Sequence, residues 1–423
     1  MEPVIGLADM AILAKLPNDV VPIQAAVGLA SGLMSLLIWS LSQVRTAVSA
    51  LVSRYFGQNN IQDIKSLIPQ ALVLSFIIGA LSYVLTNLFF DAILHFLYDK
   101  TSPEVLRYCK EYYQIRSIGL AFIISTTCIF GIFRGYQNTS WAMMVGLSGG
   151  ILNIILNYVL VLGVFDVIKP LGVSGAAYAS LIASVWMFVL SIVFLIIKTP
   201  FNLKLSLKLH HEFSEMLKMT VNMLIRTLVL NLAFVLAIRF ANTYGEVKLA
   251  AYSIGMNIWL FFSFFVDGFS NAGNAISGKL LGQKDYNGLN ELAKKLVAIN
   301  VLVALVLSLI CVVFYSKIPL WFTSETGVVN ALKEFLWLIL LAQVFNSIAF
   351  TFDGIFKGLG ETKALRNTLL IGTIFIFIPI LFGLDFFKFE MYSIWLAFIF
   401  WMLFRAFSLV VIFRKKYSSL VKA

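Results

Sequence analysis

Residues 173–198 read VSGAAYASLIASVWMFVLSIVFLIIK, a stretch that contains no charged residue before Lys198. An α-helix needs about 20 apolar residues to cross the hydrocarbon core of a bilayer, because it rises about 1.5 Å per residue across about 30 Å. This stretch is long enough to cross, and similar stretches recur along the chain. The membrane span is therefore the structural unit from which the fold is derived.

The composition of the chain excludes a water-soluble fold. Of the 423 residues, 60% are apolar and 13% are charged, whereas an ordinary soluble domain is about 45–50% apolar and about 25% charged. We predict an all-α polytopic membrane protein with twelve transmembrane helices. The apolar stretches fall at 1–14, 22–53, 66–97, 105–133, 141–164, 173–198, 214–241, 247–281, 289–315, 329–356, 366–385 and 391–413.

The two halves of the sequence repeat each other. The second stretch ends in SRYFGQNN (53–60) and the eighth in GKLLGQKD (278–285), so that Gly57 and Gly282 are 225 residues apart. FRG at 133–135 and FKG at 356–358 match at an offset of 223. Repeats with an even number of spans run parallel, about an axis along the membrane normal. We predict an N-lobe of six helices (1–198), a cytoplasmic linker (199–213) and a C-lobe of six helices (214–423).

The positive charges give an orientation. Connections after even-numbered spans, together with the C-terminus, hold more Lys and Arg than the other connections, and include Lys65, Lys204 and Lys284. Such residues are retained in the cytoplasm, which places both termini inside the cell and the protein in the inner or plasma membrane. The net charge is +11, but no basic run exceeds the three residues at 414–416. We therefore expect the lipid bilayer as a partner, and no nucleic acid.

Three carboxylates lie inside apolar stretches, at Asp9, Asp267 and Asp353. Each would cost about 2.5–3.5 kcal/mol at the bilayer centre, so each is expected to face a cavity or a partner. Asn153 and Asn157 are four residues apart on one face of the fifth span. With Asp9, they could bind a monovalent cation or form a protonation site. Alternatively, the two Asn only bond one helix to another.

Polar side chains also form stripes on three helices of the second half. Because polar groups are unfavourable against lipid, these stripes must face protein or water. Two interpretations have equal weight: a site for substrate, a second cation or a second proton, or an ion-paired network with Arg226 that holds the lobe together. The stripes contain Asn257, Asp267, Asn271 and Asn274 on the eighth span, Gln343, Asn346 and Asp353 on the tenth, and Asn222 with Arg226 on the seventh.

The sequence has no sign of an enzyme. His95, His210 and His211 lie in or beside connections, and no HExxH, GxSxG or phosphate-binding glycine loop is present. The three cysteines are far apart and lack CxxC spacing, which argues against a disulfide framework or a metal site. We expect no catalytic residue, no metal and no cofactor.

A series of short motifs resembles the MATE family, the multidrug and toxic-compound extrusion antiporters, and specifically its DinF-like branch. Each motif is weak alone, whereas their order, their spacing and the six-plus-six repeat together are specific. The resemblance runs through nearly the whole chain. The motifs are GLAD at 6–9, AVSALV at 47–52 with Gly57, FRG at 133–135, Asn153 with Asn157, GVSGAA at 172–177, DGF at 267–269 and DGI at 353–355, followed by RN at 366–367.

The resemblance implies a V-shaped pair of lobes around a central cavity, with export driven by an inward flow of H⁺ or Na⁺. It also implies that the cation site of the family's N-lobe maps onto Asp9, Asn153, Asn157 and Ser180. The family often has a carboxylate where Asn157 stands. Asp9 is then the only formal charge of this site, which favours a proton as the coupling ion.

The function expected is that of a secondary active antiporter, a monomer that exports organic, often cationic or amphipathic, compounds. The alternative is a flippase for lipid-linked saccharides of the same superfamily. A flippase would be expected to carry several basic residues that pair with pyrophosphate in its cavity. Only Arg45, Arg116, Arg226 and Arg405 lie within spans.

The first helix is expected to be truncated. Mapping the seventh span back by the repeat offset places the start of the first helix before Met1. The segment 1–15 would rise only about 21 Å as a helix, against a hydrocarbon core of about 30 Å. The sequence therefore predicts that Met1 is an internal methionine of a longer protein.

Overall fold

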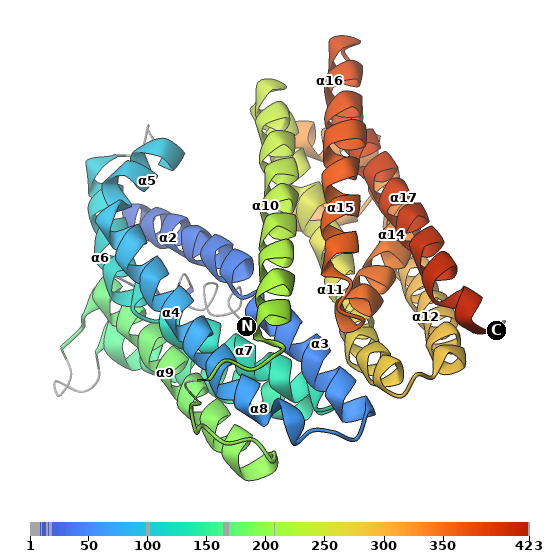
Figure 1. Cartoon of the computed structure of the whole chain (residues 1–423). Coiled ribbons are helices and arrows are strands. Elements are labelled where there is room, and N and C mark those ends of the chain that lie inside the picture. Colours follow the sequence, from blue (N-terminus) through green and yellow to red (C-terminus); the bar gives the residue numbers. More distant parts are fainter. Residues whose placement is uncertain are drawn as a thin grey trace. The chain divides into compact units, whose positions relative to one another are not determined.

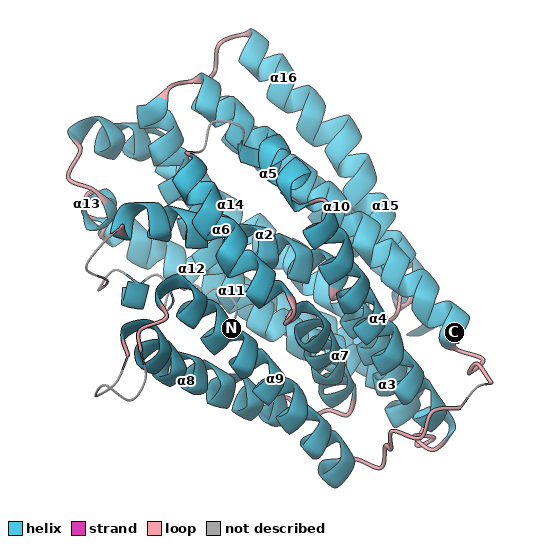
Figure 2. Ribbon diagram, turned by 90° about the vertical axis from the view of Figure 1, so that its left-hand side faces the viewer, coloured by secondary structure: helices cyan, strands magenta, loops and turns pink. Residues whose placement is uncertain are grey.

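The computed structural model describes residues 9, 11–13, 16, 19–98, 102–163, 169–206 and 208–421 of the chain. Within these ranges every regular element is a helix (Figure 2). The predicted all-α class is therefore confirmed.

The helices of the first half include one short 3₁₀ turn. Ser102 caps one of them, α6, by accepting a hydrogen bond from the Val105 N–H, and Pro103 follows at its first position, where a missing N–H costs nothing. The elements are α2 (Val20–Leu41), α3 (Val44–Gly57), η1 (Asp63–Ser66), α4 (Leu67–Leu88), α5 (Phe90–Tyr98), α6 (Pro103–Ser117), α7 (Leu120–Gly135), α8 (Ser140–Leu162) and α9 (Gly172–Lys198).

The second half contains the longest helices. A π-helical turn precedes Pro379, whose ring nitrogen has no proton for the i−4 carbonyl. The elements are α10 (Phe213–Thr243), α11 (Glu246–Gly282), α12 (Tyr286–Val313), α13 (Ile318–Phe322), α14 (Thr326–Gly358), α15 (Thr362–Gly372), η2 (Thr373–Phe377), α16 (Ile378–Phe386), α17 (Met391–Lys416) and η3 (Ser418–Val421).

Among the described residues, ten helical segments are long and apolar enough to cross a membrane. An eleventh span is formed by α6 and α7 together, which are bent by 49° at Ser117–Leu120. These eleven correspond to the eleven predicted stretches from 22–53 to 391–413. Most of the first stretch, 1–14, lies outside the described residues. The prediction that the first helix is truncated concerns the same residues and stays a prediction.

The chain divides into two compact units. The first comprises Met1–Val48 and Asn60–Leu217, and the second comprises Ser49–Asn59 and Lys218–Ala423. This division differs in detail from the lobe boundaries expected from the sequence, because the end of α3 packs with the second unit and the segment 199–217 packs with the first.

One glutamine holds the segment that follows α9 to the first unit. The Gln70 side chain donates to the carbonyls of Ser206 and Lys208, and it accepts a hydrogen bond from the His210 N–H at 3.0 Å. The expected linker is therefore bonded to α4 along part of its length.

Helices α3 and α11 meet at residues that the sequence repeat makes equivalent. The Ser49 hydroxyl donates to the Asn274 side chain, 225 residues later, and Ser53 lies against Gly278. A Cβ atom on Gly278 would lie 1.9 Å from the Ser53 Oγ. The glycine is required there because no side chain fits between the helices.

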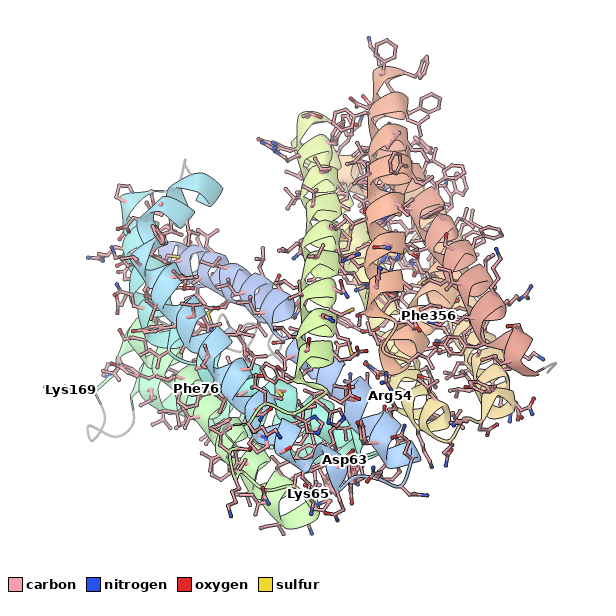
Figure 3. The ribbon with its side chains drawn as sticks, in the orientation of Figure 1. Arg54, Asp63, Lys65, Phe76, Lys169 and Phe356 are labelled. Atoms are coloured by element: carbon pink, nitrogen blue, oxygen red, sulfur yellow. The ribbon has the colours of Figure 1, made fainter. Side chains whose placement is uncertain are left out.

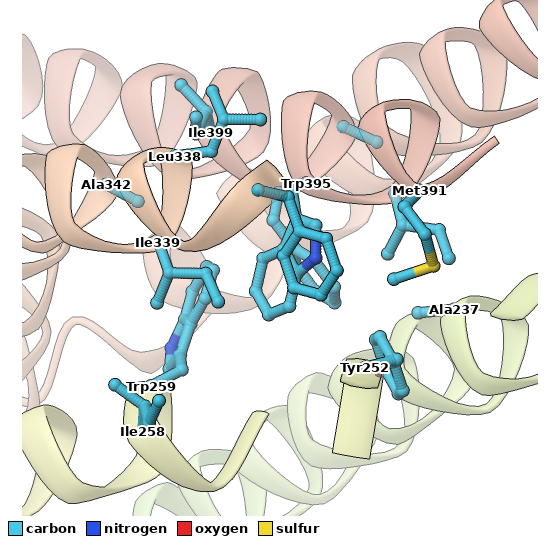
Figure 4. Packing of buried hydrophobic residues seen from close by; sticks show 14 of the residues in the cluster. Ala237, Tyr252, Ile258, Trp259, Leu338, Ile339, Ala342, Met391, Trp395 and Ile399 are labelled. Atoms are coloured by element: carbon cyan, nitrogen blue, oxygen red, sulfur yellow. The ribbon is translucent and has the colours of Figure 1, made fainter. Parts of the chain in front are cut away.

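Aromatic side chains fill the core of the second unit, in which α14 packs against α11, α12 and α17 (Figure 1). Trp395 is fully buried, and its ring centroid lies 5.8 Å from that of Trp259 and 5.6 Å from that of Phe335 (Figure 4). Phe356 on α14 is also buried, whereas Phe76 on α4 is 42% exposed (Figure 3). Such exposed apolar side chains are suited to contact with lipid.

Candidate functional site

The first site is built around Asp9, whose side chain is fully buried in the first unit. Its carboxylate accepts hydrogen bonds from the Tyr112 hydroxyl at 2.5 Å, from the Asn157 Nδ2 at 2.7 Å and from the Ser180 hydroxyl at 3.0 Å. These three donors come from α6, α8 and α9. Three helices thus converge on one acidic side chain.

Asn153 belongs to the same network without touching the carboxylate. Its Nδ2 donates to the Ser180 hydroxyl at 3.0 Å, and its backbone carbonyl accepts from the Asn157 Nδ2 at 3.1 Å. All four residues predicted for this site, Asp9, Asn153, Asn157 and Ser180, are therefore brought together. Their spacing along α8 explains part of this, since positions i and i+4 share a helix face.

A cation that the sequence analysis did not assign to this site lies beside Asp9. The Arg116 NH1 is 3.6 Å from the Asp9 Oδ2, and the side chains are 3% and 0% exposed. Arg116 lies one residue before the end of α6, where the span bends, and Tyr112 lies one turn earlier on the same face. The signal that could have found them was the i, i+4 pair of Tyr and Arg within an apolar span.

The Asp9 site is formally neutral when both charged groups are ionised, because the Asp9 carboxylate offsets the Arg116 guanidinium. The side-chain oxygens of Asn153 and Asn157 are buried and accept no hydrogen bond from the described residues. These oxygens and the Asp9 carboxylate are hard ligands. Within the described ranges, no cluster of three or more His, Cys, Asp or Glu side chains is arranged as a metal site.

The second site is an ion-paired cluster in the second unit. Asp353 on α14 pairs with Arg226 on α10, and its Oδ2 also accepts from the Arg405 NH2 on α17 at 2.8 Å. Arg405 lies over the rings of Trp401 and Phe350. The three charged side chains are nearly buried. Two predicted members of the polar stripes, Arg226 and Asp353, are therefore ion-paired with each other.

A half-buried extension of this cluster begins one turn before Arg226. The Asn222 side-chain oxygen accepts from the Arg366 NH1 at 2.7 Å, and its Nδ2 faces the Thr362 hydroxyl at 3.4 Å. The remaining nitrogens of the Arg366 guanidinium donate to the Asn367 side chain. Arg366 has no carboxylate within 4 Å in the described part of the chain.

The polar stripe of α14 is buried rather than open. The Asn346 Nδ2 donates to the Gln343 Oε1 at 3.1 Å, and the two side chains are 1% and 2% exposed. Of the two surroundings expected for this stripe, protein or water, Asn346 has protein, because tight packing of α14 against α11 encloses it. Gly354 allows this packing, since a Cβ there would lie 2.1 Å from the Ser270 carbonyl oxygen.

The stripe of α11 is divided between the interior and the surface of the second unit. Asn274 is buried against Ser49, and Asn271 is half-buried. Asp267 and Asn257 are exposed. Asp267 has no ion-pair partner among the described residues, although it lies on a helix that is apolar enough to span a membrane.

Comparisons with known proteins decide the family. A family model described as MatE matches residues 1–159 and 222–382, more than half of the chain. The chain belongs to the MatE family. Members of this family are membrane transporters rather than enzymes, and the resemblance drawn from the sequence motifs is therefore confirmed.

Curated relatives of this MatE-family chain come from plants and bacteria. Protein DETOXIFICATION 43 of Arabidopsis thaliana is 26% identical over 294 residues, which cover 69% of this chain and 54% of that protein. DNA damage-inducible protein F of Escherichia coli (strain K12) is 25% identical over 376 residues, which cover 87% of this chain and 79% of that protein. The DinF-like branch fits the second relative. The chain spans just over half the length of the first two plant relatives.

Solved MATE structures share the fold of this MatE-family chain. A crystal structure of MATE in the bent conformation has a TM-score of 0.90 at 19% identity and covers 99% of this chain and 92% of its own. An outward-facing multidrug resistance MATE family transporter of the MOP superfamily has a TM-score of 0.86, also at 19% identity. The match covers 99% of this chain and 94% of that transporter. At these identities the likeness concerns the fold alone.

Proposed function

We propose that this chain is a secondary active antiporter that exports small organic compounds in exchange for protons, which bind at Asp9. Na⁺ is the alternative coupling ion. The observation that carries the proposal is the convergence of α6, α8 and α9 on one fully buried carboxylate. Ionisable groups inside membrane spans mark ion and proton pathways more often than structural contacts.

The donors around Asp9 favour a proton over Na⁺. Tyr112, Asn157, Ser180 and Arg116 each present a hydrogen-bond donor to the carboxylate. A proton on one carboxylate oxygen requires only that a neighbouring hydroxyl reverse its role from donor to acceptor. Na⁺ would require several oxygen ligands, whereas the guanidinium has no acceptor atom and the Asn157 amide would have to turn.

Coupling follows from the contacts that depend on the charge of Asp9. Protonation removes the ion pair with Arg116 and weakens the hydrogen bonds that the carboxylate receives from Asn157 and Ser180. The contacts that join Asp9 to α6, α8 and α9 are then less stabilising. A proton that binds one arrangement of these helices better than another shifts the population between them, and substrate release in the second arrangement completes the exchange.

The exposed face of α11 supports organic cations and amphipathic compounds as substrates. Asp267 is exposed there and has no ion-pair partner in the described ranges, and Phe261 and Phe264 on the same helix are 53% and 60% exposed. A carboxylate with aromatic faces nearby can bind an organic cation through ion pairing and cation–π attraction. Asn271, one turn after Asp267, adds a polar side chain.

The flippase alternative is not favoured. The relatives of this chain include proteins named for detoxification and a probable multidrug resistance protein NorM of Bacillus anthracis, 25% identical over 339 residues. Of the intramembrane arginines, Arg116 is paired with Asp9, and Arg226 and Arg405 are paired with Asp353. We further propose that the transporter lies in the plasma membrane as a monomer with both termini in the cytoplasm.

Efflux from proteoliposomes tests this function. Purified protein is reconstituted with a fluorescent organic cation inside, and a pH gradient or a Na⁺ gradient is imposed separately. The pH gradient is expected to drive efflux, and Asp9→Asn is expected to abolish it because a neutral side chain cannot exchange a proton. Asp91→Asn, which removes an exposed carboxylate paired with Lys110, is the matched control and should transport normally. Efflux by Asp9→Asn at the parent rate would exclude Asp9 from the mechanism.

A further inference from the structure

We propose that the arginine cluster around Asp353 is a binding site for an oxyanion, namely the carboxylate of an amphipathic organic compound. The site consists of Arg226, Arg405 and Asp353 with the neighbouring pair Asn222 and Arg366. It extends the proposed transport function by naming a second chemical group that substrates carry, besides the cation that Asp267 would attract.

The charges within the cluster do not balance. Two guanidinium groups, those of Arg226 and Arg405, share the single carboxylate of Asp353, and both contact its Oδ2. One positive charge is therefore in excess where the side chains are 8%, 2% and 3% exposed. A buried charge without a counterion is costly. An anion bound at the cluster would neutralise it.

The neighbouring charges do not provide this counterion. Asp267 is not the counterion, because no basic side chain lies within 4 Å of it among the described residues. Glu361 is already paired with Lys416, and its carboxylate also accepts a hydrogen bond from the Tyr417 hydroxyl at 2.9 Å. Arg366 adds a further guanidinium that, among the described residues, is bonded only to carboxamide oxygens. The excess of positive charge therefore extends from the buried pair to the half-buried Arg366.

Arg226 has a buried donor that an anion could accept from. It is the more exposed arginine of the buried pair, and its Nε makes no hydrogen bond within the described part of the chain. Asn222 lies one turn before it on α10 and is half-buried, as is Arg366, to which it is bonded. A ligand that reaches Asn222 and Arg366 is thus one helical turn from the Arg226 guanidinium.

The geometry of the donors favours a carboxylate. Guanidinium groups present parallel N–H donors that match the two oxygens of a carboxylate, and charge-assisted bonds of this kind are roughly twice as strong as neutral ones. A lipid phosphate would offer the same chemistry. Asn222 and Arg366 lie on α10 and α15. We assign the site to a solute carboxylate, because the proposed function brings small organic compounds to this transporter.

Equilibrium binding of a matched dye pair tests the proposal. Rhodamine B carries a free carboxylate, and its ethyl ester has the same cationic ring system without that charge. Fluorescence anisotropy is measured with purified protein in phosphatidylcholine nanodiscs, with empty nanodiscs subtracted. We expect the parent protein to bind rhodamine B at least about tenfold more tightly than the ester, which corresponds to one charge-assisted contact.

Variants of the arginines locate the effect. Arg226→Gln and Arg366→Gln should each reduce the preference for the carboxylate to about threefold or less. Asp353→Asn should increase it, since both guanidinium groups are then released. Arg239→Gln removes an exposed positive charge from the same helix, α10, and should leave the preference unchanged. Arg366 is half-buried, and its replacement is therefore less disruptive to folding than that of the buried Arg226. Arg366→Gln keeps the test valid if Arg226→Gln does not fold.

Three results would overturn the proposal. The first two are equal affinity of the parent protein for the two dyes and an unchanged preference in folded Arg366→Gln. The third is that, once phosphatidylglycerol is added to the nanodiscs, the parent protein and Arg366→Gln no longer differ in preference, which would assign the site to an anionic lipid. Anion binding is measured here at equilibrium without an ion gradient, whereas proton coupling is measured by efflux under a gradient. Failure of proton coupling and failure of the anion site are therefore distinguishable.

Discussion

At the scale of single residues, the feature that decides the chemistry is the pairing of each buried carboxylate with arginine. Asp9 has Arg116 at 3.6 Å, together with three hydrogen-bond donors. Asp353 is paired with two arginines, and no uncharged side chain in the described structure donates a hydrogen bond to its carboxylate. The first carboxylate can lose its charge and keep a hydroxyl partner, whereas the second is fixed by two cations. This difference explains why we assign proton exchange to Asp9 alone.

The pair of Asp9 and Arg116 should be coupled in stability. Removing one partner leaves the other as a buried unpaired charge, and such changes cost about 3–5 kcal/mol. Arg116→Gln is therefore expected to lower the melting temperature strongly, and Asp9→Asn combined with Arg116→Gln should recover much of the loss. Thermal unfolding of the single and double variants in detergent measures this coupling, and additive losses would contradict it.

Asn157 should control the choice of coupling ion. Its Nδ2 lies 2.7 Å from the Asp9 Oδ1, so Asn157→Asp would place a second carboxylate beside the first. Two neighbouring carboxylates attract a cation more strongly and provide oxygen ligands where a donor stood. Efflux driven by a Na⁺ gradient should appear in Asn157→Asp, with Asn290→Asp on the polar start of α12 as a control. A purely pH-driven Asn157→Asp would show that charge at this position does not select the ion.

At the scale of elements, glycines decide which helices touch. The α3–α11 crossing brings repeat-equivalent positions together. A Cβ atom on Gly57 would lie 2.0 Å from the Lys279 carbonyl oxygen. A Cβ atom on Gly282 would lie 2.1 Å from the Arg54 carbonyl oxygen. The repeat relates these two contacts to each other, because Gly57 corresponds to Gly282 and Arg54 corresponds to Lys279, each 225 residues later. Motif matching located these glycines as repeat markers, and the structure gives their physical role as sites of close helix approach.

The crossing of α3 and α11 predicts that a second substitution compensates for the loss of a glycine. Gly278→Ala should destabilise the protein by about 1–3 kcal/mol, because the new methyl group would overlap the Ser53 side chain. Ser53→Gly combined with Gly278→Ala should recover part of this loss, since it removes the nearest atoms of the clash. Thermal unfolding of the two variants checks this. Equal melting temperatures for Gly278→Ala and the parent protein would mean that the helices separate freely here.

At the scale of the whole molecule, the sequence predicts what depends on local pattern. Apolar length predicted eleven spans that the structure describes, and the i, i+4 spacing of Asn153 and Asn157 predicted their common face. Tyr112 and Arg405 could not be assigned, because their partners are 103 and 52 residues away and only tertiary packing brings them together. Whether Asn346 faces water or protein could not be decided for the same reason, since a polar stripe is compatible with either.

In the proposed mechanism a proton bound at Asp9 is exchanged for substrate, and proton release on substrate binding measures this exchange. Purified protein is placed in weakly buffered detergent with a pH-sensitive dye, and tetraphenylphosphonium is added as the organic cation. We expect release of about one proton per parent protein molecule and none from Asp9→Asn, because antiport requires the two ligands to compete. The same release from Asp9→Asn, or no release from parent protein that binds the cation, would contradict it.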